Sequence, residues 1–72
     1  MENANSDEIH PYVTIQLTST GLYVPVYIAL TPHGFPQVSD QGDARADFSD
    51  AKHDAVEMAK RLGCRYLVPV HG

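Results

Sequence analysis

The stretch YVTIQLTSTGLYVPVYIAL, residues 12–30, decides the fold of this chain, because it has the pattern of two strands joined by a tight turn. Residues 12–17 alternate between apolar and polar side chains, which predicts a strand with one buried face. The next four residues, TSTG, predict a hairpin turn in which Gly21 supplies any positive φ that the turn requires. Residues 22–30 predict a longer second strand. Pro25 removes one backbone donor from it, which indicates an edge strand or a bulge.

A third strand is expected after a second turn, TPHG at residues 31–34. Residues 35–39 predict the start of this strand, and residues 45–48 could continue or replace it. Glycine-bearing turns bracket the region, so the sequence leaves the position of the third strand open.

One amphipathic helix is predicted over residues 50–62. Ser49 is a good N-cap and Gly63 a good C′ residue, so both ends carry a boundary signal. Glu57 and Arg61 are an i, i+4 pair of opposite charge. The apolar stripe of this helix consists of Ala51, Ala55, Met58, Ala59 and Leu62.

The predicted fold is α+β, in the order β-β-β-α-β, with a mostly antiparallel sheet and one helix packed on one face. The last strand, residues 65–70, follows the helix and can therefore run parallel to an earlier strand. Pro69 indicates that it lies at an edge. We expect residues 1–10 to be a flexible N-terminal segment, because they are polar and without period, and residues 11–72 to form a single α+β domain.

Side-chain alternation predicts which residues of the first two strands face the helix. The expected helix side carries Val13, Ile15, Leu17, Val24, Val26 and Ile28. The expected open face carries Tyr12, Thr14, Gln16, Tyr23 and Tyr27. Tyrosines on an exposed sheet face suit a binding surface, since they offer contact area at little entropic cost. Cross-strand aromatic pairing is the alternative explanation for them.

Composition limits the classes of function. The chain has 72 residues, a single cysteine and a net charge of −4, and all five basic residues lie after position 44. A core this small favours a protein partner or a second copy, as in a homodimer.

The single cysteine, the absence of a long apolar run and a start without signal-peptide character predict a cytoplasmic protein without membrane contact. Direct nucleic-acid binding is not expected, because it needs a clustered basic surface. The acidic half could meet a basic partner, or it could be a solvated face that keeps the protein in solution.

Five aspartates at intervals of three or four residues run through GFPQVSDQGDARADFSDAKHDA, residues 34–55. They are Asp40, Asp43, Asp47, Asp50 and Asp54. The stretch does not match a calcium loop, because only Asp40 precedes Gly42 and no glutamate follows at the required spacing. Turn chemistry explains Asp40 and Asp43, and the positive end of the predicted helix explains Asp50 and Asp54.

No enzyme site is predicted. The carboxylates do not converge in the manner of a metal-dependent nuclease, and the four histidines include no pair at zinc spacing. Phosphate-loop and G-x-S-x-G motifs are missing from the sequence. Cys64 directly follows the helix-ending Gly63, and it has the pattern of a buried small apolar residue rather than a nucleophile. We therefore expect no catalytic residue, no metal and no cofactor.

Two segments resemble antitoxins of the HicB type. GLYV at residues 21–24 is similar to the G-x-Y-V strand of that family, and FPQVSDQGD at residues 35–43 is similar to its Pro-bearing turn and S-x-G-[DE] helix opening. The chain departs from the family in three ways: it has no Pro-Gly-Cys turn, its loop before the helix is longer, and it shows no C-terminal DNA-binding module. The resemblance implies a sheet-plus-helix fold and neutralisation of a basic ribonuclease toxin, without autorepression.

The chain also resembles, in type alone, the small phage-encoded anti-CRISPR proteins. These are tiny, acidic, cysteine-poor α+β units without catalytic residues. Since the group shares no motif, no site residue carries over to this chain. The resemblance implies inhibition by binding in the host-cell cytoplasm, often by occupying the basic DNA-binding surface of a CRISPR effector as a DNA mimic would.

The sequence therefore leads to the hypothesis of a non-enzymatic inhibitor that acts by occlusion, most specifically an anti-CRISPR protein. Its partner would be a basic nucleic-acid-binding protein such as a CRISPR effector subunit. Charge would come from Asp40, Asp43, Asp47 and Asp50, and packing from Tyr23 and Tyr27. The alternatives are a HicB-like antitoxin and a small structural domain that dimerises through an open sheet face or edge.

Overall fold

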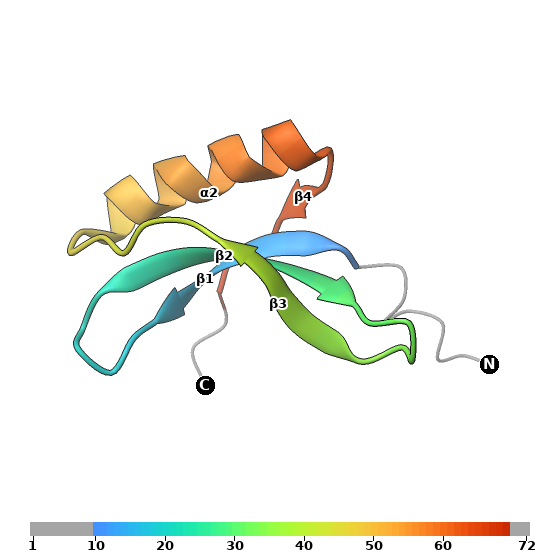
Figure 1. The fold of residues 1–72 in the computed structure, drawn as a ribbon. Helices are drawn as coiled ribbons and strands as arrows, with labels where there is room; N and C mark the ends of the chain where they lie inside the picture. The colour runs from blue at the N-terminus through green and yellow to red at the C-terminus, as the bar shows by residue number, and fades with distance from the viewer. Residues whose placement is uncertain (1–9, 70–72) are drawn as a thin grey trace.

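The computed structural model describes residues 10–69, which form one sheet with one helix on it (Figure 1). The elements are β1 (Tyr12–Leu17), β2 (Tyr23–Leu30), β3 (Pro36–Gln41), α2 (Phe48–Leu62) and β4 (Arg65–Tyr66). The strand order in the sheet is β3-β2-β1-β4, antiparallel except that β4 runs parallel to β1. The predicted α+β fold, its β-β-β-α-β order and the parallel direction of the last strand are confirmed, but β4 ends at Tyr66, and residues 67–69 of the predicted strand do not belong to it. The predicted flexible segment falls on residues 1–10, of which 1–9 lie outside the described residues, as does the predicted strand end at Val70.

Two turns of the same design connect the first three strands, TSTG at residues 18–21 and TPHG at residues 31–34. In each turn the threonine N–H donates to the carbonyl oxygen four residues later, at 2.8 Å. The threonine Oγ1 accepts from the N–H of that same later residue, at 3.0 Å in the first turn and 3.1 Å in the second. The glycines that close the turns, Gly21 and Gly34, have φ of 83° and 86°, a region that residues with a Cβ enter only with strain. Both predicted turns are confirmed.

The register of the first hairpin corrects the predicted faces of β2. Leu17 lies opposite Tyr23, and Val13 lies opposite Tyr27. Residues directly opposite each other on paired strands point to the same face, so Tyr23 and Tyr27 lie on the helix side with the buried Val13. The prediction that these tyrosines lie on the open face is wrong. The residues wrongly predicted for the helix side are Val24, Val26 and Ile28.

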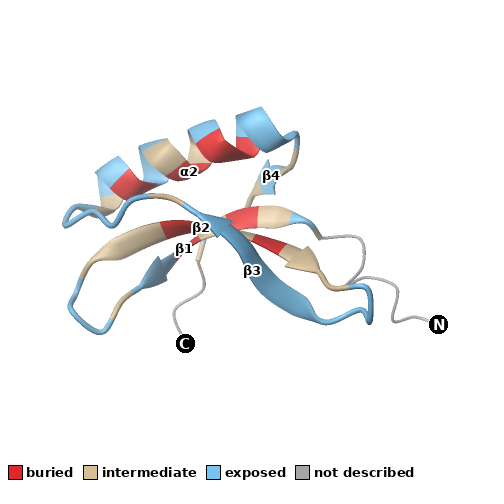
Figure 2. Ribbon diagram, in the orientation of Figure 1, coloured by how far each residue is buried: buried red, intermediate tan, exposed pale blue. Residues whose placement is uncertain are grey.

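The core under α2 is small and rich in alanine (Figure 2). Its buried members are Val13, Ile15, Ala51, Ala55, Met58 and Ala59, with Tyr23, Tyr27, Phe48, Cys64 and Tyr66 packed around them. The four helix residues belong to the predicted apolar stripe, whereas its fifth member, Leu62, is 38% exposed. Val26 and Ile28 are also buried, but on the other face of the sheet.

The N-cap of α2 is Asp47 rather than the predicted Ser49. The backbone of Asp47 is extended, and its carboxylate accepts from the Ser49 N–H at 3.1 Å and from the Ser49 hydroxyl at 3.2 Å. Aspartate caps a helix as well as serine does, so the cap chemistry alone did not choose between them. The predicted C-terminus at Gly63 is confirmed: its φ is 70°, and the next N–H, of Cys64, donates to the Ala59 carbonyl at 3.0 Å.

Pro25 lies in the central strand β2 and not at an edge, but the ladder between β2 and β3 breaks next to it. β3 ends at Gln41, and residues 42–44, which we call the arch, separate it from Arg45. Arg45 rejoins the sheet, where it exchanges two backbone hydrogen bonds of 2.7 Å with Tyr23. Both predicted positions of the third strand therefore contact β2. Residues 35–39 do so mainly as part of β3, and residues 45–48 do so through the Arg45 bridge.

Gly42 fits the arch tightly against Pro25. The Gly42 N–H donates to the Pro25 carbonyl at 2.9 Å. A Cβ on Gly42 would lie 2.8 Å from Cγ of Pro25, which is closer than Cβ atoms approach other heavy atoms. The missing side chain of Gly42, and not a positive φ, allows the arch to lie against the sheet here.

Candidate protein-binding site

A cleft of about 340 Å³ lies between the arch and α2, and we call it the arch–helix cleft. The buried residues Pro25 and Met58 contribute its apolar lining. The charged lining consists of Asp40, Asp43, Arg45, Asp54, Glu57 and Arg61. With four carboxylates and two guanidinium groups, the lining has a formal charge of −2.

Arg45 fastens the arch to both the sheet and the helix. Its backbone pairs with Tyr23, and its Nε donates to Oδ2 of Asp54 at 2.7 Å. The hydrogen bond and the charge of Asp54 raise the pKa of Arg45, and the charges of Asp50 and Asp43 add to this rise. Arg45 therefore stays charged and offsets part of the negative charge around it.

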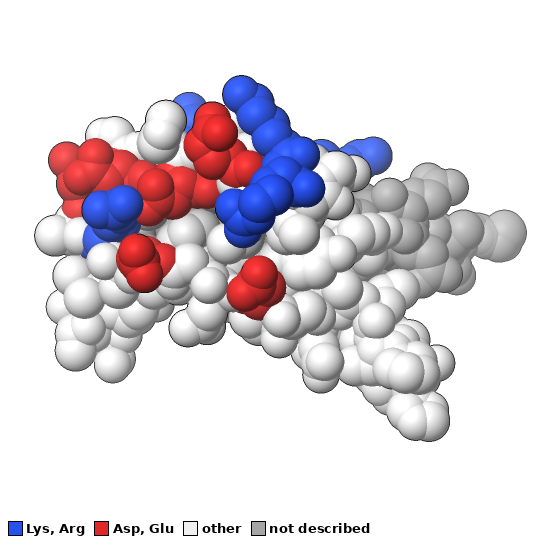
Figure 3. Space-filling view, turned by 45° about the horizontal axis from the view of Figure 1, so that its top comes forward, with Lys and Arg blue, Asp and Glu red and all other residues white. Residues whose placement is uncertain are grey.

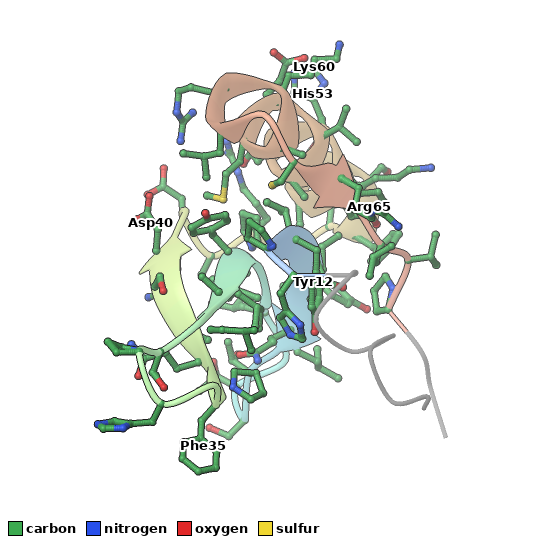
Figure 4. All side chains as sticks on the ribbon, turned by 90° about the vertical axis from the view of Figure 1, so that its right-hand side faces the viewer. Tyr12, Phe35, Asp40, His53, Lys60 and Arg65 are labelled. Carbon is green, nitrogen blue, oxygen red and sulfur yellow. The ribbon has the colours of Figure 1, made fainter. Side chains whose placement is uncertain are left out.

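Asp40 lines the cleft, and its carboxylate makes a local backbone contact. It is paired with Tyr27 in the sheet, and its side chain lies on the side facing α2 (Figure 4). Its Oδ1 accepts from the Gln41 N–H at 2.8 Å. Asp43, in the arch, is exposed and has no hydrogen bond or ion pair from its side chain within residues 10–69. Of the predicted charged residues, Asp40 and Asp43 are the two that the structure places in one cleft.

Asp47 and Asp50 lie outside this cleft. Asp47 is occupied as the N-cap of α2. Asp50 is in the first turn of the helix, where it lines a smaller hollow with Arg45, His53 and Asp54. Acidic and basic side chains are interleaved over this part of the surface (Figure 3).

The two predicted tyrosines pack against the core. Tyr23 meets Phe48, at the start of α2, edge to face, with ring centroids 5.5 Å apart and an interplanar angle of 83°. Tyr27 packs against the cluster under the helix. Both are half-buried, so they offer a partner less area than an open-face position would.

The helix supplies three charged cleft residues that the sequence did not assign to a site, Asp54, Glu57 and Arg61. Glu57 lies 3.7 Å from Nζ of Lys60, and the predicted pairing partner Arg61 also lines the cleft. The three residues are spaced three and four apart, so their shared helix face was available from the sequence. The position of the arch beside that face was not.

The described residues contain neither a cluster of metal-ligating side chains nor a thiol with a lowered pKa. Within residues 10–69, no group of three or more histidine, cysteine or acidic side chains is placed to hold a metal ion. Burial raises the pKa of Cys64, which disfavours the nucleophilic thiolate.

Within residues 10–69, no helix is long and apolar enough to cross a membrane.

Comparison of the chain with protein-family models, with curated proteins and with solved structures gave no match.

Proposed function

We propose that this protein is a non-enzymatic inhibitor, acting in the cytoplasm, that binds a basic protein through the arch–helix cleft and occludes its nucleic-acid site. The observation that carries the proposal is the cleft itself, which four carboxylates from β3, the arch and α2 line together with two guanidinium groups, for a formal charge of −2. Such a surface complements lysine and arginine side chains, whose charged ends can meet the carboxylates.

The particular form that we propose is an anti-CRISPR protein. A CRISPR effector presents a basic channel that holds the nucleic-acid backbone, so an acidic surface can compete for it. The net charge of −4 on so small a chain supports this choice. Direct binding of this protein to nucleic acid is not part of the proposal.

The first test is phage plaquing on hosts with active CRISPR immunity of several types, with and without expression of this protein. We expect restored plaquing with one type, and no effect in hosts from which the immune system has been deleted. Absence of restoration with every type would contradict the anti-CRISPR form of the proposal.

The second test asks whether the cleft carries the activity. Asp40→Asn with Asp43→Asn removes two charges from the cleft and should weaken partner binding about tenfold, with a shallower salt dependence. A matched control, Gln16→Lys with His33→Lys, raises the net charge by the same amount at exposed positions outside the cleft. Equal effects of the two pairs would show that net charge alone is responsible.

A second candidate function is a HicB-like antitoxin. The observation that favours it is the β-β-β-α-β order, which is the sheet-plus-helix fold that the resemblance implies. Co-expression with a basic ribonuclease toxin encoded beside this protein should restore growth of the host, and the same cleft variants should abolish the rescue. Unaltered toxicity would remove this candidate.

A further inference from the structure

Strand β3 forms one edge of the sheet, and all six of its residues are exposed (Figure 2). An edge strand usually presents a row of unpaired N–H and C=O groups to which another strand can add. Whether β3 can accept such a strand depends on which of its backbone groups point outward and whether they are free.

The pairing with β2 identifies the outward groups. Tyr23 exchanges backbone hydrogen bonds with Arg45 on the β3 side of β2, so odd-numbered residues of β2 bond in that direction. Their partners on β3 are Gln37 and Asp40, whose backbone groups point inward. The residues that direct their backbone groups away from the sheet are therefore Pro36, Val38 and Gln41.

Two of these three residues have no free donor. Pro36 has no N–H. The Gln41 N–H donates to the carboxylate of Asp40 at 2.8 Å. Between Val38 and Asp40 the register shifts, which leaves Ser39 as an additional residue and bends the strand. Val38 alone retains both outward groups in the usual arrangement.

We infer that β3 is closed to strand addition, and that the Asp40 carboxylate is the group that closes its C-terminal half. A ladder needs a donor at every second residue, and β3 offers one. The other edge of the described sheet is β4, a strand of two residues with Pro69 three residues beyond its end. A second copy or a partner's strand therefore does not extend this sheet through β3, and partners meet the protein through side-chain surfaces. This inference does not depend on the proposed function.

The test combines two substitutions that open the edge. Pro36→Val restores the backbone N–H at residue 36, and Asp40→Ala frees the N–H of Gln41. Light scattering across a concentration series should give the wild type the mass of one 7.9 kDa chain. The opened variant should shift toward the mass of two or more chains as concentration rises. In amide-exchange NMR of the wild type, Gln41 should be protected and Val38 should exchange rapidly at every concentration.

The controls separate the hydrogen bond from the charge. Pro36→Val with Asp43→Ala removes the same charge but keeps the acceptor for Gln41, and it should behave as the wild type. Asp40→Asn keeps an acceptor oxygen, so the Gln41 amide should remain protected, whereas Asp40→Ala alone should lose that protection. An opened variant that is folded by circular dichroism yet keeps the mass of one chain would overturn the inference. Wild-type β3 amides that become protected as concentration rises would overturn it as well.

Discussion

The aspartates of residues 40–54 carry the same charge, yet their partners give them different functions. Asp47 caps the helix, Asp40 accepts from the Gln41 N–H, and Asp54 holds Arg45. Asp43, on the arch, is exposed and has no hydrogen bond or ion pair from its side chain within the described residues, although its charge acts on Arg45. At the scale of single residues, the acidic stretch therefore contains structural carboxylates beside ones that are open to a partner.

Replacing Asp47 with alanine should lower the free energy of unfolding by about 1 kcal/mol, because the first turn of α2 loses its cap. Asp47→Asn keeps the capping oxygen and should lose much less. Urea denaturation followed by circular dichroism measures both, with Lys52→Ala as an exposed control in the same helix. Equal loss in the alanine and asparagine variants would show that charge, and not capping, is the contribution of Asp47.

Tyr66 offers the opposite case, a polar group that the fold does not satisfy. Its hydroxyl is buried and has no hydrogen-bond partner among residues 10–69. Because an unsatisfied buried hydroxyl is unfavourable, Tyr66→Phe should raise the free energy of unfolding by about 1 kcal/mol. Thermal melts should show a higher midpoint than for the wild type, and Tyr12→Phe serves as the control. A destabilised Tyr66→Phe would mean that the hydroxyl has a partner after all.

At the scale of elements, the two threonine–glycine turns set the geometry of the sheet. Both place glycine at positive φ, with nothing within 4 Å of where a Cβ would be. Gly34→Ala should therefore cost about 1 kcal/mol through backbone strain and not through a clash. Gly34→Asn should recover part of this loss, since asparagine tolerates the left-handed region better. Chemical denaturation of both variants tests this, and equal stability of the alanine variant would contradict the turn geometry.

The strands, turns and helix stripe were predictable because each has a local signal. The faces of β2 were not predictable from alternation, since both sides of that strand carry apolar residues: Val24, Val26 and Ile28 on one, Tyr23, Pro25 and Tyr27 on the other. The choice is made by the first turn, whose length places Leu17 opposite Tyr23. Alternation gave the grouping of these residues correctly, and the turn geometry decided which group meets the helix.

The arch–helix cleft could not be predicted from the sequence, for a different reason. It depends on the close contact of Gly42 with Pro25 and on the return of Arg45 to Tyr23, which are contacts between residues far apart in the chain. Asp40 and Asp43 were candidates because of their negative charge. Their neighbours on the helix were identified only once the arch had a position.

At the scale of the whole molecule, stability should decrease in alkaline solution. Burial raises the pKa of Cys64 above its ordinary 9.0 and the pKa of Tyr66 above its ordinary 10.0. The protonated forms are therefore favoured by folding. The contribution of these two groups to the free energy of unfolding is complete at a pH below their ordinary pKa values. It is lost as the pH rises through their higher pKa values in the folded state. Urea midpoints measured from pH 7 upward should fall less steeply for Cys64→Ala with Tyr66→Phe than for the wild type. If the urea midpoints of the variant and the wild type fall equally steeply with pH, neither Cys64 nor Tyr66 causes the loss of stability.

The attachment of the arch at three points has a kinetic consequence for any partner that uses the cleft. Because Gly42, the Arg45 backbone and the Arg45–Asp54 pair already hold this segment, its conformational entropy is lost during folding and not during association. Encounter should then proceed without a slow rearrangement step. Changes in the cleft should alter chiefly the residence time of the complex, whereas changes in surrounding charge should alter how quickly it forms.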